Sequence, residues 1–228
     1  MRNTNAIDTM DETTGAEEWV ATGVLPAAQR RSRERRDRLL SAGLELIADR
    51  SIDDIGIAEI TAAAGYSVGS FYRRFTNKEG YVMALQDIVL SEFTARARGE
   101  FAGSAWQGVA RQRVVESAVE FLVDENRRAR GLIETALKTA ASERTTWAPY
   151  YASRHAFYEL LRRLLEPHVP ADRHADPRLA VAFAIQTIFA VLNQVTSLRT
   201  GAIRIDDGRL VDEVSRMCCD YLGFDQDT

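Results

Sequence analysis

Residues 57–75 read IAEITAAAGYSVGSFYRRF, the most informative stretch of the chain. The apolar positions of Ile57–Ala64 predict one short helix, and Ser67–Phe75 predicts a second. Gly65 between them can adopt the left-handed conformation that ends a helix without a steric penalty. Ser67 is a good residue type to cap the second helix, and the small Ala62–Ala64 permit close approach. Two short helices joined by such a turn are the arrangement of a helix-turn-helix.

The second of these helices carries groups suited to nucleic acid. The small Gly69 and Ser70 allow its first turn to enter a major groove. Tyr72, Arg73 and Arg74 then offer donors for phosphates and base edges. An alternative reading is a surface helical hairpin with an incidental arginine pair, and the motif alone leaves both open.

The rest of the chain has a helical period almost throughout. Leu40, Leu44 and Ile47 recur at the spacing of one helix face, and Tyr81, Leu85 and Ile88 form another such row. No alternating apolar runs are separated by a hairpin turn signal. We therefore expect an all-α fold of about nine helices, at residues 33–49, 57–64, 67–75, 78–98, 106–124, 127–141, 145–167, 178–199 and 208–222.

Composition and charge indicate a globular protein and are compatible with a nucleic-acid partner. The chain has 228 residues, 46% of them hydrophobic and 27% charged, which fits a globular protein of one large domain or two modest ones. The net charge is −4, but residues 30–80 carry ten Lys and Arg against eight Asp and Glu. An acidic total therefore does not exclude a nucleic-acid partner, because the local field matters.

Other features argue against a membrane protein, a secreted protein, and a disulfide-rich or zinc-binding protein. The longest apolar region, Leu179–Leu192, is broken by Gln186 and Thr187 and is shorter than a membrane span requires. The N-terminal residues have no apolar core of a secretory signal. The two cysteines, Cys218 and Cys219, are adjacent and favour neither a disulfide framework nor a zinc site. We expect a cytoplasmic protein with no metal, no cofactor and no membrane partner.

No pattern of catalytic residues is found. The three histidines are scattered, and neither a glycine-rich phosphate loop nor a nucleophile elbow occurs. We expect that the protein is not an enzyme.

The motif and its flanks resemble the TetR family of transcriptional regulators. The match runs from a basic helix at 31–49, through AEITAAAGYSVGSFYRRF, to NKEGYVMAL at 77–85. The family pattern is held by Ile60, Ala63, Ala64, Gly65, Ser67, Gly69, Phe71, Tyr72, Phe75, Lys78 and Glu79. The sequence departs from it at Ile55-Gly56, where the family has a capping Thr, and at Arg73-Arg74, so no relative's operator can be assumed.

The resemblance also implies which residues contact DNA and which part of the DNA each of them binds. It implies an expected DNA-contacting set of Thr61, Ser67, Val68, Gly69, Ser70, Tyr72, Arg73, Arg74 and Lys78. Tyr72 and Lys78 would bind phosphates, and Val68, Gly69, Ser70 and Arg73 would reach base edges. Phe71 and Phe75, four residues apart, should lie in the core. Thr61 is either a phosphate contact or an exposed position with no role.

We expect residues 1–29 to be a disordered tail, 30–80 the DNA-binding domain and 81–228 a ligand-binding and dimerisation domain. Five arginines precede or open the first helix: Arg30, Arg31, Arg33, Arg35 and Arg36. They form either an arm that enters a minor groove, whose potential favours arginine, or a solvated run of charge.

The C-terminal part has residues suited to an apolar pocket with polar tips. Trp147-Ala-Pro-Tyr-Tyr places three large aromatic residues beside a proline. Gln186 and Asn193 are polar positions on an apolar helix and suit either ligand contacts or dimer contacts. The predicted ligand-binding set is Trp106, Phe121, Trp147, Tyr151, His155, Gln186, Phe189 and Asn193.

The resulting hypothesis is a homodimeric repressor that leaves a palindromic double-stranded operator when it binds a small apolar or aromatic effector. The dimer would form through the last two helices. Phe183, Ile188, Val191, Val195 and Leu198 form one apolar row on the first of them, and Ile185, Phe189, Leu192 and Thr196 form a second. The rival hypothesis is a helical small-molecule-binding protein or enzyme whose helix-turn-helix segment only packs.

Overall fold

The computed structural model describes residues 30–48, 50–139, 148–197 and 201–224. Within these ranges the chain forms nine α-helices and three single 3₁₀ turns, so the expected all-α class is confirmed. The α-helices are α1 (Arg30–Ile47), α2 (Ile57–Ala63), α3 (Val68–Tyr72), α4 (Lys78–Phe101), α5 (Arg111–Arg128), α6 (Arg130–Thr139), α7 (Ala148–Leu165), α8 (Pro177–Ser197) and α9 (Arg209–Leu222). The 3₁₀ turns are η1 (Ile52–Asp54), η2 (Ser104–Trp106) and η3 (Glu166–His168).

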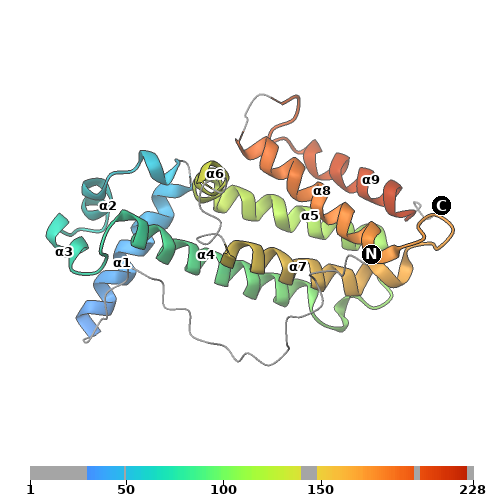
Figure 1. Ribbon diagram of the computed structural model, residues 1–228, viewed down its shortest axis with the longest axis horizontal. Helices are drawn as coiled ribbons and strands as arrows, with labels where there is room; N and C mark the ends of the chain where they lie inside the picture. The colour runs from blue at the N-terminus through green and yellow to red at the C-terminus, as the bar shows by residue number, and fades with distance from the viewer. Residues whose placement is uncertain (1–29, 49, 140–147, 198–200, 225–228) are drawn as a thin grey trace, which may run out of the picture.

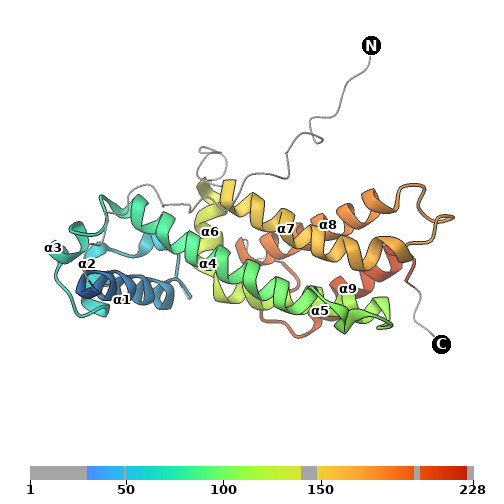
Figure 2. The ribbon, with the colours of Figure 1, turned by 90° about the horizontal axis from the view of Figure 1, so that it is seen from below.

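The molecule is elongated, with α1–α3 at one end and α5, α7, α8 and α9 at the other (Figure 1). Helix α4 runs from the first group into the second, and α6 lies between them in both views (Figures 1 and 2). We call α1–α3 with the first turns of α4 the N-terminal module. The helices beyond it form the C-terminal bundle.

The N-terminal module has its own core. Its buried side chains come from all four helices, and the largest are Phe71, Phe75 and Tyr81. Leu132 of α6 also belongs to this cluster, so the module's core extends to a helix 50 residues further along the chain. The expected burial of Phe71, Phe75, Tyr81 and Leu85 is confirmed.

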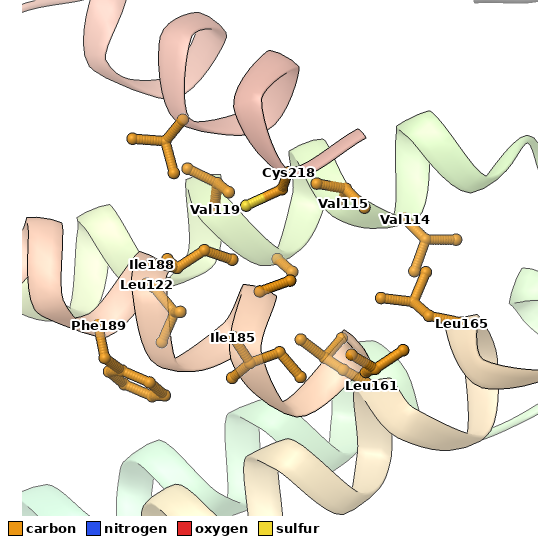
Figure 3. Packing of buried hydrophobic residues seen from close by; sticks show 14 of the residues in the cluster. Val114, Val115, Val119, Leu122, Leu161, Leu165, Ile185, Ile188, Phe189 and Cys218 are labelled. Carbon is orange, nitrogen blue, oxygen red and sulfur yellow. The ribbon is translucent and has the colours of Figure 1, made fainter. Parts of the chain in front are cut away.

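The C-terminal bundle is held by a larger cluster of apolar side chains. Figure 3 shows Val115 and Val119 of α5 on either side of Cys218 of α9, with Leu122 of α5 nearer to Ile185 of α8. Every one of these side chains is nearly or fully buried. Burial of an aliphatic side chain of this size stabilises a fold by about 1.5–3 kcal/mol.

The expected range 106–124 for the fifth helix was wrong at both ends. The 3₁₀ turn at Ser104–Trp106 precedes α5, which begins at Arg111 rather than 106. The interruption expected between residues 124 and 127 is absent, because α5 continues to Arg128 and buries Glu125 and Asn126. Asn126 donates to the Leu122 carbonyl at 2.8 Å and accepts from Thr196 at 3.3 Å, so tertiary partners satisfy a polar residue that the sequence pattern places at the surface.

Helix α8 is longer than the apolar region seen in the sequence. Its segment Pro177–Thr196 has a mean hydropathy of 1.7, enough by length and composition for a membrane span, and 44% of it is buried inside the protein. Pro177 occupies the first helical position, and the Asp176 carboxylate accepts from the Leu179 amide at 3.0 Å. Apolar core packing accounts for one side of this helix.

Candidate nucleic-acid interface and ligand cavity

The turn between α2 and α3 has the conformation that its residues predict. Gly65 has φ +73°, the left-handed region where a side chain is strained. The amide of Gly65 donates to the Ala62 carbonyl at 3.1 Å, and that of Tyr66 donates to Thr61 at 2.8 Å, which closes the end of α2. Ser67 is at the N-cap position of α3, but its hydroxyl lies 3.2 Å from that of Ser70 and makes no capping bond.

One face of α3 is open to solvent. Val68 is 42% exposed and Tyr72 51% exposed, values high for large apolar and aromatic side chains. Gly69 is exposed on the same short helix and Arg73 directly after its end, while Ser70 and Arg74 are half-buried. The residues between Ser67 and Arg74 that the sequence predicts to contact bases and phosphates therefore lie at one surface of the structure.

The opposite face of α3 is anchored in the module's core. The Phe71 ring lies 5.2 Å from Phe75 and 5.3 Å from Tyr81, measured between ring centroids. The Tyr81 hydroxyl donates to the Leu39 carbonyl of α1 at 2.8 Å. A Cβ at Gly43 would lie 1.8 Å from that hydroxyl, so the glycine is required for α1 and α4 to approach. A helix of five residues cannot be stable alone, and these contacts fix its exposed face.

Thr61 does not lie at this surface. Its side chain is only 2% exposed, and its hydroxyl donates to the Ala58 carbonyl at 3.0 Å. Both sequence-based readings of Thr61 require an exposed position, so both are corrected. Because the hydroxyl bonds to a carbonyl of α2 itself, Thr61 can be buried without leaving a polar group unpaired.

Cationic groups flank the exposed face. Lys78 is the first residue of α4, and its ammonium donates to the Asp53 carbonyl at 3.2 Å. Asn77 caps α4 by accepting from the Gly80 amide at 2.8 Å.

Arg33 and Arg35 are exposed on α1, and Arg36 pairs with Asp37 at 2.9 Å. The side chains of Arg30 and Arg31 lie outside the described residues.

A cavity of about 60 Å³ lies in the C-terminal bundle at the junction with α6. Most of its wall is apolar, from Val89, Leu90 and Phe93 of α4, Leu122 of α5, Leu132 and Ile133 of α6, and Phe189 of α8. Its polar and charged lining residues are Gln86, Glu125, Asn126, Tyr150, Ser153, Arg154 and Asn193. An apolar cavity with a few polar groups is the usual form of a small-molecule site.

The predicted ligand-binding residues are not all at this cavity. Phe189 and Asn193 line it. Tyr151 is 51% exposed, and His155 and Gln186 are also exposed, all outside the lining. Trp106 stacks on Phe101 near the protein surface and donates to the Glu100 carbonyl, and Phe121 packs between Phe93 and Phe157. Trp147 lies outside the described residues.

Six polar or charged lining residues are absent from the predicted ligand-binding set: Gln86, Glu125, Asn126, Tyr150, Ser153 and Arg154. Tyr150 lines the cavity rather than its neighbour Tyr151, because a helix turns by about 100° per residue and only one of the pair faces inward. The position of Arg154 one turn after Tyr150 is the only sequence signal that places it on that face. Gln86 stands beside Asp87 on a helix of mixed polar and apolar residues, so its sequence context does not distinguish it from a surface position.

Helix α6 connects the cavity to the N-terminal module. Leu132 lines the cavity and also belongs to the module's core. A Cβ at Gly131 would lie 1.9 Å from the Arg50 carbonyl oxygen and 2.6 Å from that of Ile47, so α6 fits closely against the end of α1. Helix α6 is therefore in contact with both the cavity and the end of α1.

Over the described ranges, no group of three or more His, Cys, Asp or Glu side chains is placed to hold a metal ion. Burial raises the pKa of Cys218 to about 12 and that of Cys219 to about 11. Both are free thiols that fill the core.

Comparison with known proteins is consistent with this architecture. Residues 39–85 match the family model described as bacterial regulatory proteins, tetR family. An uncharacterised HTH-type transcriptional regulator of Bacillus subtilis (strain 168), YwcC, is 37% identical over 49 residues, 22% of each chain. A second from the same organism, YvdT, is 27% identical over 67 residues, 29% of this chain and 34% of its own. The matched stretch thus spans between a fifth and a third of these relatives.

Solved structures match over most of the chain. A tetR-family transcriptional regulator from Streptomyces coelicolor has a TM-score of 0.65 at 20% identity, covering 84% of this chain and 80% of its own. A TetR transcription regulator from Haloarcula marismortui has a TM-score of 0.62 at 11% identity, covering 84% and 97%. Residues 112–222 match a second model, described as a tetracyclin repressor-like C-terminal domain. With both of its parts matched, the chain belongs to the TetR family of bacterial regulatory proteins.

Proposed function

We propose that the protein is a homodimeric repressor that binds a palindromic operator in the cytoplasm and releases it when a small ligand occupies the C-terminal cavity. The exposed face of α3 is the observation that most directly supports DNA binding. Tyr72 and Arg73 are displayed there while Phe71 of the same short helix is fully buried. A rigidly held helix with exposed donors is suited to the major groove.

The ligand response is supported by the helices that line the cavity. Helix α4 contributes Gln86, Val89 and Phe93 to the wall and begins at Lys78 beside α3. Helix α6 contributes Leu132 and contacts α1 and η1. A ligand that shifts either helix changes the spacing of the two recognition helices, which must match half-sites about 34–36 Å apart.

The dimer is supported by an exposed apolar face at the last two helices. Leu179 is 64% exposed, Phe183 52% and Met217 41%. Of the two apolar rows on α8, the row of Ile185, Phe189, Leu192 and Thr196 is buried; in the other row Ile188 is buried but Phe183 is not. Phe183 faces outward against Tyr221, with ring centroids 5.3 Å apart. A second copy would cover this face, as large single-sided apolar surfaces rarely stay open.

The test is binding to duplex DNA across a salt series. Phosphate contacts release counterions, so the logarithm of the binding constant should fall linearly with the logarithm of salt concentration. Selection from a random duplex library should then return a palindrome. A protein that fails to bind duplex DNA at low salt would support the rival, a helical small-molecule-binding protein.

A further inference from the structure

Most polar groups in the cavity wall already have partners within the protein. Asn126 uses its amide nitrogen on the Leu122 carbonyl and its oxygen on Thr196. The Ser153 hydroxyl donates to the Tyr150 carbonyl at 2.8 Å. Neither residue therefore requires a ligand for its hydrogen bonds.

Gln86 is the exception. Its side chain is 95% buried on α4, and its amide nitrogen Nε2 makes no hydrogen bond although it is shielded from solvent. Buried amide donors are nearly always paired, because losing water without gaining a partner is unfavourable. The cavity that Gln86 lines is where an acceptor for this donor can be placed.

Arg154 adds a positive charge to the same wall. Its guanidinium carbon lies 3.9 Å from the centroid of Phe189 and 5.5 Å from that of Tyr150. No carboxylate forms an ion pair with it in the described part of the chain. Glu125, the one acid of the lining, is paired with Arg96. Of the two charged side chains in the cavity wall, Arg154 is therefore the one without an ion-pair partner among the described residues, so its positive charge is available to a ligand.

We propose that the effector is a small monocarboxylic acid with an apolar body. Its carboxylate binds the Arg154 guanidinium and accepts from Gln86 Nε2, and its body lies against Val89, Phe93, Leu122 and Phe189. This proposal rests on the cavity's role in the proposed function and adds the chemical class of the ligand. A cation is disfavoured by Arg154, and a dianionic phosphate would leave most of its acceptors without donors.

The size of the cavity favours a short acid. Its volume of about 60 Å³ is less than the roughly 150 Å³ that accommodates benzene in an engineered cavity. A short aliphatic chain fits with small side-chain movements. A longer one requires the flexible Arg154 side chain to rotate off Phe189, which carboxylate binding itself would favour.

The experiment measures binding of butanoate, hexanoate and octanoate by calorimetry to the full-length protein, each beside its primary amide. The acid and amide of one length share their apolar body and differ in charge. We expect each carboxylate that binds to be preferred over its amide by about tenfold or more, since a charge-assisted bond is lost in the amide. Equal binding of acid and amide, or no binding of any acid at millimolar concentration, would overturn the proposal.

Variants locate the preference in the structure. Arg154→Gln should abolish the preference for the acid and leave amide binding unchanged, whereas the matched control Arg163→Gln, an exposed arginine on the same helix, should keep it. Gln86→Met should weaken acid binding several-fold while leaving the unliganded protein at least as stable, because it removes an unpaired buried amide. Acid preference that survives Arg154→Gln contradicts the proposal. The acids and amides are also compared on the unmodified protein, so the preference for the acid is tested even if a variant does not fold.

The same samples separate this proposal from the proposed function. Acid binding that depends on Arg154, in a protein that ignores duplex DNA, would support the ligand class and reject the repressor. Salt-dependent DNA binding without acid binding would reject the ligand class alone.

Discussion

The hydroxyl oxygens of Ser51 and Thr135 lie 3.2 Å apart, although 84 residues separate them in the sequence. Both side chains are buried. Because the Thr135 hydroxyl donates to the Gly131 carbonyl at 2.9 Å, it is Ser51 that donates to Thr135. The bond joins the loop after α1 to α6, where the N-terminal module meets the cavity.

Thr135→Val should destabilise the protein by about 1–3 kcal/mol, because it leaves the Ser51 hydroxyl buried without its partner. Ser51→Ala with Thr135→Val should recover part of the loss, since neither hydroxyl remains. Urea unfolding of the two single variants and the double variant gives the coupling energy. Strictly additive losses would show that the bond contributes nothing.

Gly131→Ala should force α6 away from α1, because its Cβ would lie 1.9 Å from a backbone oxygen that cannot rotate away. A cost of about 1–3 kcal/mol is typical of such overpacking. The matched control is Gly99→Ala on α4, where no atom lies within 4 Å of the added carbon. Gly99→Ala should stabilise by up to about 1 kcal/mol through helix propensity. Thermal unfolding of both variants tests the difference, and similar melting temperatures would argue against a tight α1–α6 contact.

Arg73→Ala and Tyr72→Phe should separate specificity from affinity. A guanidinium can read guanine bidentately, so its loss should cost about 1–3 kcal/mol at one or two base positions. The Tyr72 phenol is expected to fix the phosphate backbone, and its loss should weaken all sequences alike. A base-substitution scan of the selected operator distinguishes them. The same profile for both variants would refute the assignment.

Phe183→Glu should convert the proposed dimer to a monomer, since it places a carboxylate in the middle of the exposed face of α8. The control is Tyr151→Glu, an aromatic residue with similar exposure on α7. Sedimentation at micromolar concentration should show a monomer for the first variant and a dimer for the second. A monomeric unmodified protein would contradict the dimer outright.

Stability should fall in alkaline solution because of Cys218. Burial raises the pKa of this thiol to about 12, while a solvated thiol in the unfolded chain has an ordinary pKa of 9.0. Between these values the unfolded state loses a proton that the folded state keeps, so stability is complete below pH 9 and decreases above it. The slope for one such thiol is about 1.4 kcal/mol per pH unit. Cys218→Ala should show a shallower decline in unfolding free energy from pH 9 to 11, and an unchanged slope would contradict the burial of the thiol.

Much of the N-terminal module follows from local chemistry. Gly65 ends α2, Asn77 and Lys78 begin α4, and the four-residue spacing of Phe71 and Phe75 fixes which face of α3 is buried. Each of these depends on neighbours within one or two helical turns, which is the range that periodicity and capping report.

Contacts between helices that are far apart in the sequence determine which polar side chains are buried and which residues line the cavity, and local sequence patterns do not predict these features. Asn126 of α5 is buried against α8, where the Thr196 hydroxyl donates to its side-chain oxygen. The cavity lies where five helices converge, so no single helix period could show that Gln86 and Arg154 face one space while Trp106 and Tyr151 lie outside it. Helix spacing is determined by the packing of all side chains together, and that sum exists only in the folded chain.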